Sequence, residues 1–260
     1  MIARIDYVDG YYLKRCDLLE YAGAYGGKAE GAFNIIQDGI AKGYTGFVTV
    51  GSRFSPQCDI VSAICNTMMV SCDLFMPKGK DTLVTQAIQS RDRCSIHAPL
   101  SRGAYTNVLI AYAKKFAQDN NKCFIPFGML CKKNIDVIAK QTYNIPEYIH
   151  RIIVPVGSGC TMIGIIQGLK EINRLDIEVI GVITGSSTSR KTVTSYIPKL
   201  FNPIKYSFVE YISGVKPKYV YTTVTDETIG DINLDPIYEG KCKKFLKPND
   251  LLWIVGYHKI

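Results

Sequence analysis

Short apolar runs alternate with amphipathic segments along most of the chain. Runs rich in β-branched and other apolar residues predict strands at residues 11–15, 46–50, 71–76, 122–127, 151–156, 178–183 and 251–255. Apolar residues that recur every third or fourth position predict helices at residues 29–43, 56–69, 106–120, 161–173 and 226–234. This repeated order of strand, turn and helix predicts an α/β protein with a mostly parallel sheet.

Length and composition narrow the class of protein. With 260 residues, 47% of them apolar, the chain can bury the core of one large domain or two small ones. No stretch approaches the roughly 20 uncharged apolar residues that a membrane-spanning helix needs, and the first ten residues carry charges where a signal peptide would be apolar. We therefore expect an unprocessed cytoplasmic protein.

Charge and cysteine content add little specific chemistry. The net charge of +8 comes from scattered lysines and arginines, which permits an acidic partner but is more typical of an ordinary basic surface. The nine cysteines are odd in number, contain no CxxC pair and mostly lie in apolar runs. They indicate reduced core residues, and together with three histidines that share no ligand spacing they predict no metal site.

Two strand-to-helix turns carry residues suited to anions, and ligands of such sheets usually bind at these turns. The turn at residues 50–57, VGSRFSPQ, offers side-chain donors from Ser55 and Gln57 before a helix whose free N–H groups suit a carboxylate. The turn in VPVGSGCTMIG, residues 154–164, combines glycines, hydroxyls and a helix start, which favours one phosphate. Its candidate phosphate ligands are Gly157, Ser158, Gly159, Cys160 and Thr161.

A single lysine in GAYGGKAEGAF, residues 23–33, stands where a helix is predicted to begin. The positive end of a helix dipole disfavours a cation there, so Lys28 is either a solvated side chain or an amine held for chemistry. An amine nucleophile that forms a Schiff base needs an aldehyde partner, and the neighbouring anion turns suggest an aldehyde that bears one phosphate.

Several ordered segments add a family resemblance. They are YYLKRCDL at 11–18, GGKAEGAFNII at 26–36, VTVGSRFSPQCDIVSA at 48–63, VPVGSGCTMIGIIQGLK at 154–170 and NLDPIYEGKCKKFL at 233–246. These segments resemble pyridoxal-phosphate enzymes of the tryptophan synthase β-subunit fold (fold type II), most closely 1-aminocyclopropane-1-carboxylate deaminase and D-cysteine desulfhydrase. The resemblance implies the two-domain fold of that family, shortened at the N-terminus, with pyridoxal 5′-phosphate as cofactor.

The resemblance also implies roles for individual residues. Lys28 lies on the position of the cofactor-binding lysine, and residues 157–161 lie on the phosphate loop. Glu239 lies on the position that faces the pyridine nitrogen, which strengthens the cofactor as an electron sink for a carbanion. Tyr238 matches a tyrosine placed over the substrate. Tyr221 matches a second such tyrosine without its flanking glycines, and could equally be an aromatic residue at a strand end.

One departure from the family bears on the reaction. The family's Ser-Asn pair in the carboxylate loop is Ser55-Pro56 here, and proline has neither a backbone N–H nor a side-chain amide. Ser55, Pro56 and Gln57 remain the expected substrate-contacting positions. A weakly held carboxylate favours decarboxylation as an alternative to deaminase or lyase chemistry.

The sequence thus predicts two domains, a large cofactor-binding domain of residues 1–43 and 136–260 and a small α/β domain of residues 44–135. The implied function is α-carbanion chemistry on an amino acid or a derivative, in a homodimer without membrane attachment. Two alternatives stay open: modification of an amino-acid group carried on a nucleotide or nucleic acid, and a non-catalytic relative that acts as a binding protein.

Overall fold

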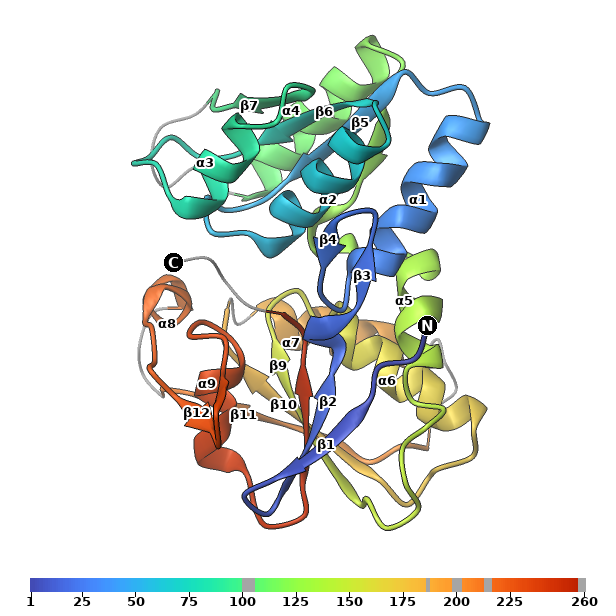
Figure 1. Cartoon of the computed structure of the whole chain (residues 1–260), viewed down its shortest axis with the longest axis vertical. Helices are drawn as coiled ribbons and strands as arrows, with labels where there is room; N and C mark the ends of the chain where they lie inside the picture. Colours follow the sequence, from blue (N-terminus) through green and yellow to red (C-terminus); the bar gives the residue numbers. More distant parts are fainter. Residues whose placement is uncertain (100–105, 186–187, 198–202, 213–216, 257–260) are drawn as a thin grey trace. The chain divides into compact units, whose positions relative to one another are not determined.

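The computed structural model describes residues 1–99, 106–185, 188–197, 203–212 and 217–256 (Figure 1). Contacts divide the chain into two compact units, each built on its own sheet. Of the described residues, unit 1 comprises Met1–Leu19 and residues 130–256, and unit 2 comprises Glu20–Met129. No helix in the part of the chain that the structure describes is long and apolar enough to cross a membrane.

Unit 2 contains a four-stranded parallel sheet in the order β7-β6-β5-β8. Its strands are β5 (Gly46–Val50), β6 (Ser71–Phe75), β7 (Cys94–His97) and β8 (Cys123–Ile125), with a small hairpin of β3 (Glu20–Tyr21) and β4 (Ala24–Tyr25). Its helices are α1 (Ala29–Ala41), α2 (Pro56–Thr67), α3 (Leu83–Gln89) and α4 (Thr106–Asp119), and a 3₁₀ turn follows at Phe127–Met129.

Strand β5 is buried along its whole length because helices cover both faces of the sheet. Phe47 packs in a cluster with residues of α1, α2 and α3, whereas Val48 and Val50 pack with α4 on the other face. The same packing explains why contacts group residues 20–43 with residues 44–129, where the sequence placed them with the larger domain. Helix α1 buries Ala29, Ala32 and Ile36 in the cluster that contains α2.

Unit 1 contains a six-stranded sheet in the order β1-β2-β14-β9-β10-β11, parallel except for the antiparallel pair β1-β2. Its strands are β1 (Ile5–Val8), β2 (Tyr11–Arg15), β9 (Arg151–Val156), β10 (Glu178–Ile183), β11 (Tyr206–Glu210) and β14 (Leu251–Ile254). Its helices are α5 (Lys132–Lys140), α6 (Cys160–Glu171), α7 (Thr188–Tyr196), α8 (Pro217–Thr222) and α9 (Glu239–Cys242), with 3₁₀ turns at Cys16–Leu18 and Lys243–Phe245. The mostly parallel α/β architecture is confirmed.

The predicted helix at residues 226–234 is wrong. This segment forms a hairpin of β12 (Thr228–Ile229) and β13 (Ile232–Asn233). Gly230 takes a φ of +53° at the turn, which glycine adopts without a Cβ penalty, and its N–H donates to Asp9 Oδ2 at 2.8 Å. The spacing of Ile229 and Ile232 therefore reflects a tight turn between paired strands, not one face of a helix.

Helices α5 and α6 of unit 1 approach closely at Gly168. A Cβ atom there would lie 2.3 Å from the backbone oxygen of Ala139 and 2.5 Å from Thr142 Oγ1. We expect Gly168→Ala to lower the free energy of unfolding by about 1–3 kcal/mol, because backbone must move to admit the methyl group. Urea denaturation measures the effect, with the exposed Lys170→Ala on the same helix as control. Equal losses in both variants would contradict this explanation.

Candidate active site

The turn after β9 in unit 1 has the backbone of an anion cradle. Gly159 takes a φ of +90° directly before α6 and lets the chain turn from strand to helix in three residues. The first turn of α6 then directs its backbone N–H groups at the turn. A Cβ atom on Gly157 would lie 3.0 Å from the ring and the hydroxyl of Tyr238, so the tyrosine packs directly on this turn.

The end of the neighbouring strand β10 borders the same turn. A Cβ atom on Gly185 would lie 3.5 Å from the Cα atom of Gly157. Thr184, the residue before it, is fully buried, and within the described chain its hydroxyl oxygen has no hydrogen-bond partner. The edge formed by β9 and β10 therefore combines glycine backbone with a buried hydroxyl that can still bind a ligand.

Tyr238 and Tyr221 form a pair beside the turn. Their rings meet edge to face with centroids 6.3 Å apart, and their side chains are hydrogen-bonded. Burial, followed by the proximity of Tyr221 and Asp235, raises the pKa of Tyr238 well above 10. Tyr238 is thus a protonated phenol at neutral pH, able to donate a hydrogen bond or a proton.

Glu239 is the most deeply buried carboxyl group of this region, with no exposed surface. Its Oε1 accepts the N–H of Val255 at 2.6 Å, while among the described residues its Oε2 has no hydrogen-bond partner. Burial first, and then the nearby Asp235, raises the pKa of Glu239 well above its usual 4.5. The described residues therefore leave Oε2 of Glu239 available for a polar partner such as a bound group.

The segment that carries Tyr238 and Glu239 is held by its own turn. Asp235 Oδ1 accepts the N–H groups of Ile237 at 2.9 Å and Tyr238 at 2.8 Å, and its carbonyl accepts the N–H of Gly240 at 2.9 Å. A Cβ atom on Gly240 would clash with Thr225 Oγ1 at 2.0 Å. These contacts fix the backbone that carries the adjacent side chains of Tyr238 and Glu239.

Lys241 is a residue of this site that the sequence analysis did not single out. Its side chain is fully buried, and Nζ donates to the carbonyl oxygens of Val220 at 2.6 Å and Tyr221 at 3.4 Å. Burial lowers the pKa of Lys241 to about 8. The lysine thus ties α9 to the end of α8 that carries Tyr221. In the sequence, only its position directly after Tyr-Glu-Gly could have pointed to Lys241.

Lys28 occupies the predicted position in unit 2, the residue that caps the N-terminus of α1. Its side chain is half-buried and close enough to Cys58 for its charge to oppose the rise in the pKa of that thiol. Burial nevertheless raises the pKa of Cys58 to about 12, against both Lys28 and a hydrogen bond with Ser55. Lys28, Ser55 and Cys58 therefore lie together at one end of α2.

The loop from Gly51 to Gln57 holds the predicted substrate-contacting residues. Ser55 precedes α2, whose first residue is Pro56, and a Cβ atom on Gly51 would lie 2.7 Å from Ser55 Oγ. Gln57 is 3% exposed, and its amide nitrogen donates to Thr49 Oγ1 at 2.8 Å and to the Pro126 carbonyl at 2.9 Å. Gln57 thus braces the loop, and its contact with substrate stays a prediction.

The predicted residues fall into two sets, one in each unit. Unit 1 holds Gly157, Ser158, Gly159, Cys160, Thr161, Tyr221, Tyr238 and Glu239. Unit 2 holds Lys28, Ser55, Pro56 and Gln57. Within each set the residues come from separate elements that end near one another. The roles assigned to them from the sequence stay predictions.

Comparison with known proteins identifies the family. The profile of the family described as "Pyridoxal-phosphate dependent enzyme" matches residues 4–213, most of the chain. The chain belongs to this family. The resemblance noted in the sequence is therefore confirmed, and pyridoxal phosphate is the cofactor of the family.

Solved structures share the fold at low sequence identity. A homologue of 1-aminocyclopropane-1-carboxylate deaminase superposes with a TM-score of 0.79 at 20% identity, over 98% of this chain and 89% of that one. Maize serine racemase matches with a TM-score of 0.69 at 13% identity, over 99% and 88% of the two chains. Threonine deaminase isoform 2 of Solanum lycopersicum matches with 0.64 at 14% identity, over 99% and 79%. No curated protein matches the chain by sequence.

Unit 1 fits the cofactor in two independent ways. The buried Oε2 of Glu239 lacks a partner among the described residues, and a pyridine nitrogen would supply one. The glycine turn before α6 directs the backbone N–H groups of the first helical turn at a bound anion, with Tyr238 packed against Gly157 beside it. Both features are present in the folded chain of unit 1 without a bound cofactor.

We expect the burial of Glu239 to make stability depend on pH in the cofactor-free protein. The folded state keeps the proton to a pKa well above 4.5, whereas the unfolded chain releases it near 4.5. Above pH 4.5, release of this proton therefore stabilises the unfolded state. The free energy of unfolding falls as pH rises toward the pKa of Glu239 in the folded state. Glu239→Gln cannot titrate at this position and should become progressively more stable relative to wild type as pH rises above about 5. A difference that stays constant with pH in urea denaturation would contradict the buried, protonated carboxyl.

Proposed function

We propose that the protein is an enzyme that uses pyridoxal phosphate to break a bond at the α-carbon of an amino acid or an amino-acid derivative. When bound, the cofactor supplies an electron-accepting ring that stabilises negative charge at that carbon. Deaminase, lyase and decarboxylase chemistry all begin in this way. The proposal rests above all on Glu239, whose buried Oε2 has no hydrogen-bond partner among the described residues and would suit a ring nitrogen.

The family resemblance suggests which residues would hold the cofactor. Gly157, Ser158, Gly159, Cys160 and Thr161 would bind its phosphate. Lys28 would bind its aldehyde carbon through Nζ, and Glu239 would hydrogen-bond its ring nitrogen. A carboxyl that is costly to ionise alone becomes a favourable partner once a protonated nitrogen pairs with it.

The other residues would handle protons and orientation. Lys28, once released by an incoming substrate amine, would move a proton at the α-carbon through Nζ. Tyr238, kept protonated by burial, would act as an acid from its hydroxyl, with Tyr221 as its hydrogen-bond partner. Ser55 would orient the substrate carboxylate. Pro56 offers no donor beside it, so loss of carbon dioxide is one of the reactions to be tested.

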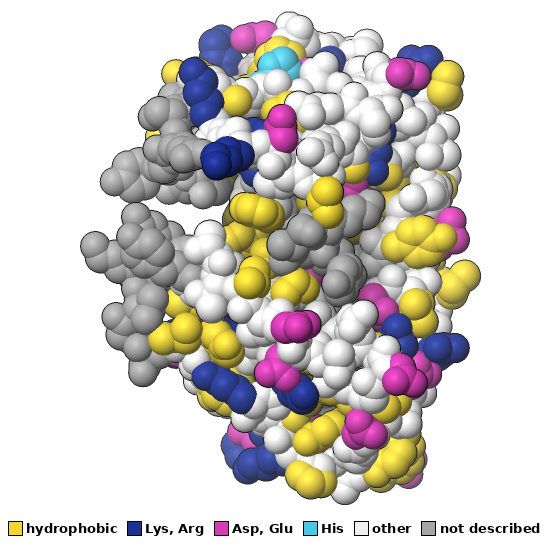
Figure 2. All heavy atoms as spheres, turned by 60° about the vertical axis from the view of Figure 1, so that its left-hand side comes forward, with side chains coloured by type: hydrophobic (Ala, Val, Ile, Leu, Met, Phe, Trp, Pro, Cys, Tyr) yellow, Lys and Arg dark blue, Asp and Glu magenta, His cyan; other side chains and the backbone are white. Residues whose placement is uncertain are grey.

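The alternative substrate and the assembly stay predictions. On the face shown in Figure 2, lysine and arginine side chains lie dispersed with acidic ones between them. A nucleic-acid-linked substrate would therefore have to be recognised locally, and retention on DNA at low salt that is lost at high salt would favour it. The expected homodimer and cytoplasmic location are likewise proposals, and light scattering measures the former.

The decisive test is reduction of the purified holoprotein with borohydride, followed by peptide mapping. Before reduction, wild type should absorb at about 410–430 nm, and after reduction it should carry the cofactor on Lys28. Lys28→Ala should carry none, whereas Lys42→Ala at the other end of α1 should be labelled like wild type. Wild type that stays colourless with added cofactor would overturn the proposal and favour the non-catalytic binding protein.

A further inference from the structure

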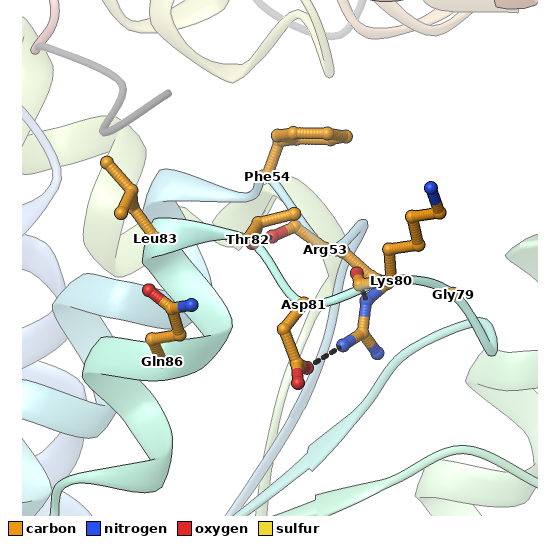
Figure 3. Close-up of a pocket in the computed structure, with 8 residues that line it drawn as sticks. All are labelled: Arg53, Phe54, Gly79, Lys80, Asp81, Thr82, Leu83 and Gln86. Carbon is orange, nitrogen blue, oxygen red and sulfur yellow. Dashed lines mark hydrogen bonds and ion pairs between the residues drawn. The ribbon is translucent and has the colours of Figure 1, made fainter.

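A pocket of about 600 Å³ lies wholly within unit 2, on the same loop as Ser55 (Figure 3). Its lining comes from the loop after β5, from the loop that joins β6 to α3, and from the start of α3: Arg53, Phe54, Gly79, Lys80, Asp81, Thr82, Leu83 and Gln86. Both loops leave the carboxyl ends of adjacent parallel strands, where ligands of such sheets bind. The volume is typical of a small-molecule site and far exceeds what a small amino acid fills.

Arg53 ties the two loops together before any ligand arrives. Its Nε donates to the carbonyl of Lys80 at 2.7 Å, and its Nη2 pairs with Asp81 Oδ1 at 2.6 Å. In return Thr82 Oγ1 donates to the carbonyl of Arg53 at 2.6 Å. A Cβ atom on Gly79 would lie 2.7 Å from Arg53 Cδ, so the loops are also closely packed. The pocket wall is therefore preorganised, which lowers the cost of binding.

The lining combines apolar surface with a cation. Figure 3 shows Phe54, Leu83 and Lys80 projecting to one side of the two loops, while the Arg53–Asp81 pair lies on the other. Leu83 is half exposed and Phe54 half buried, so both present apolar surface to a ligand. Asp81 offsets the charge of Arg53, and the ammonium of the exposed Lys80 gives the pocket a net positive charge.

We propose that this pocket binds the part of the substrate that extends beyond its amino-acid group, and that this part is an aromatic ring bearing an anionic group. The ring would stack on Phe54 and contact Leu83. The anion would pair with Lys80. The exposed amide of Gln86, which also lines the pocket, would hydrogen-bond the ring edge. The inference rests on the proposed function because the pocket shares its loop with Ser55.

The test measures binding to the borohydride-reduced holoprotein, in which the cofactor occupies its own phosphate site. Phenyl phosphate carries the ring and the anion, inorganic phosphate carries the anion alone, and benzyl alcohol carries the ring alone. We expect phenyl phosphate to bind at least about tenfold more tightly than either of the other two by calorimetry. Equal affinity for phenyl phosphate and inorganic phosphate would overturn the proposal.

Variants assign the effect to the pocket. Lys80→Met and Phe54→Leu should each weaken phenyl phosphate about tenfold. The matched control is Lys78→Met, on the same loop but outside the lining, which should change affinity less than about twofold. Equal losses of phenyl phosphate affinity in Lys80→Met and Lys78→Met would show that general surface charge causes the effect. That result would overturn the proposed pocket.

Two further comparisons distinguish a free ligand from one carried on nucleic acid, and failure of the pocket proposal from failure of the proposed function. A mononucleotide that binds as tightly as a short single-stranded oligonucleotide supports a free small molecule, and tighter, salt-sensitive binding of the oligonucleotide supports the same chemistry carried on nucleic acid. Absence of the reduced cofactor on Lys28 would refute the proposed function before any pocket measurement. A labelled Lys28 without preference for phenyl phosphate would refute the pocket alone.

Discussion

Burial of a single carboxyl group, that of Glu239, is the constraint on which the arrangement of unit 1 depends. A carboxyl without exposure is costly to ionise, so the surrounding chain must hold its backbone firmly and leave one oxygen for a partner. The turn at Asp235 and the missing side chain at Gly240 supply that rigidity. The buried Lys241, which follows Gly240, hydrogen-bonds to backbone carbonyls at the end of α8 and so fixes the segment that carries Tyr221.

In unit 2 the structural requirement is different: polar loops at the carboxyl ends of the parallel strands must be held rigid. Two long side chains do this by turning inward. Gln57 bonds to Thr49 on β5 and to the backbone after β8, and Arg53 bonds to the loop after β6. Loops held by such contacts can present Ser55 and Phe54 in defined positions, since little entropy is left to lose when a ligand binds.

Much of the architecture could be predicted from the sequence. The apolar runs that became β5, β9 and β10 are buried along their whole length or at every position but the first, and such runs have few alternatives. The hairpin at residues 228–233 was missed because two isoleucines three apart suit a helix as well as a turn. Lys241 and Arg53 were missed as structural groups because a lysine or an arginine in a sequence normally indicates a solvated surface.

The sequence by itself determined the α/β fold, the glycine turn before α6 and the family, because local patterns and motifs are written in consecutive residues. It also marked Lys28, Tyr238 and Glu239 as candidates. Only the tertiary structure decided that one buried oxygen of Glu239 has no partner among the described residues, that Gln57 faces its own sheet, and that Arg53 and Lys80 line one pocket. Burial, charge pairing and hydrogen bonding depend on residues far apart in the chain, and these terms exist only once the chain has folded.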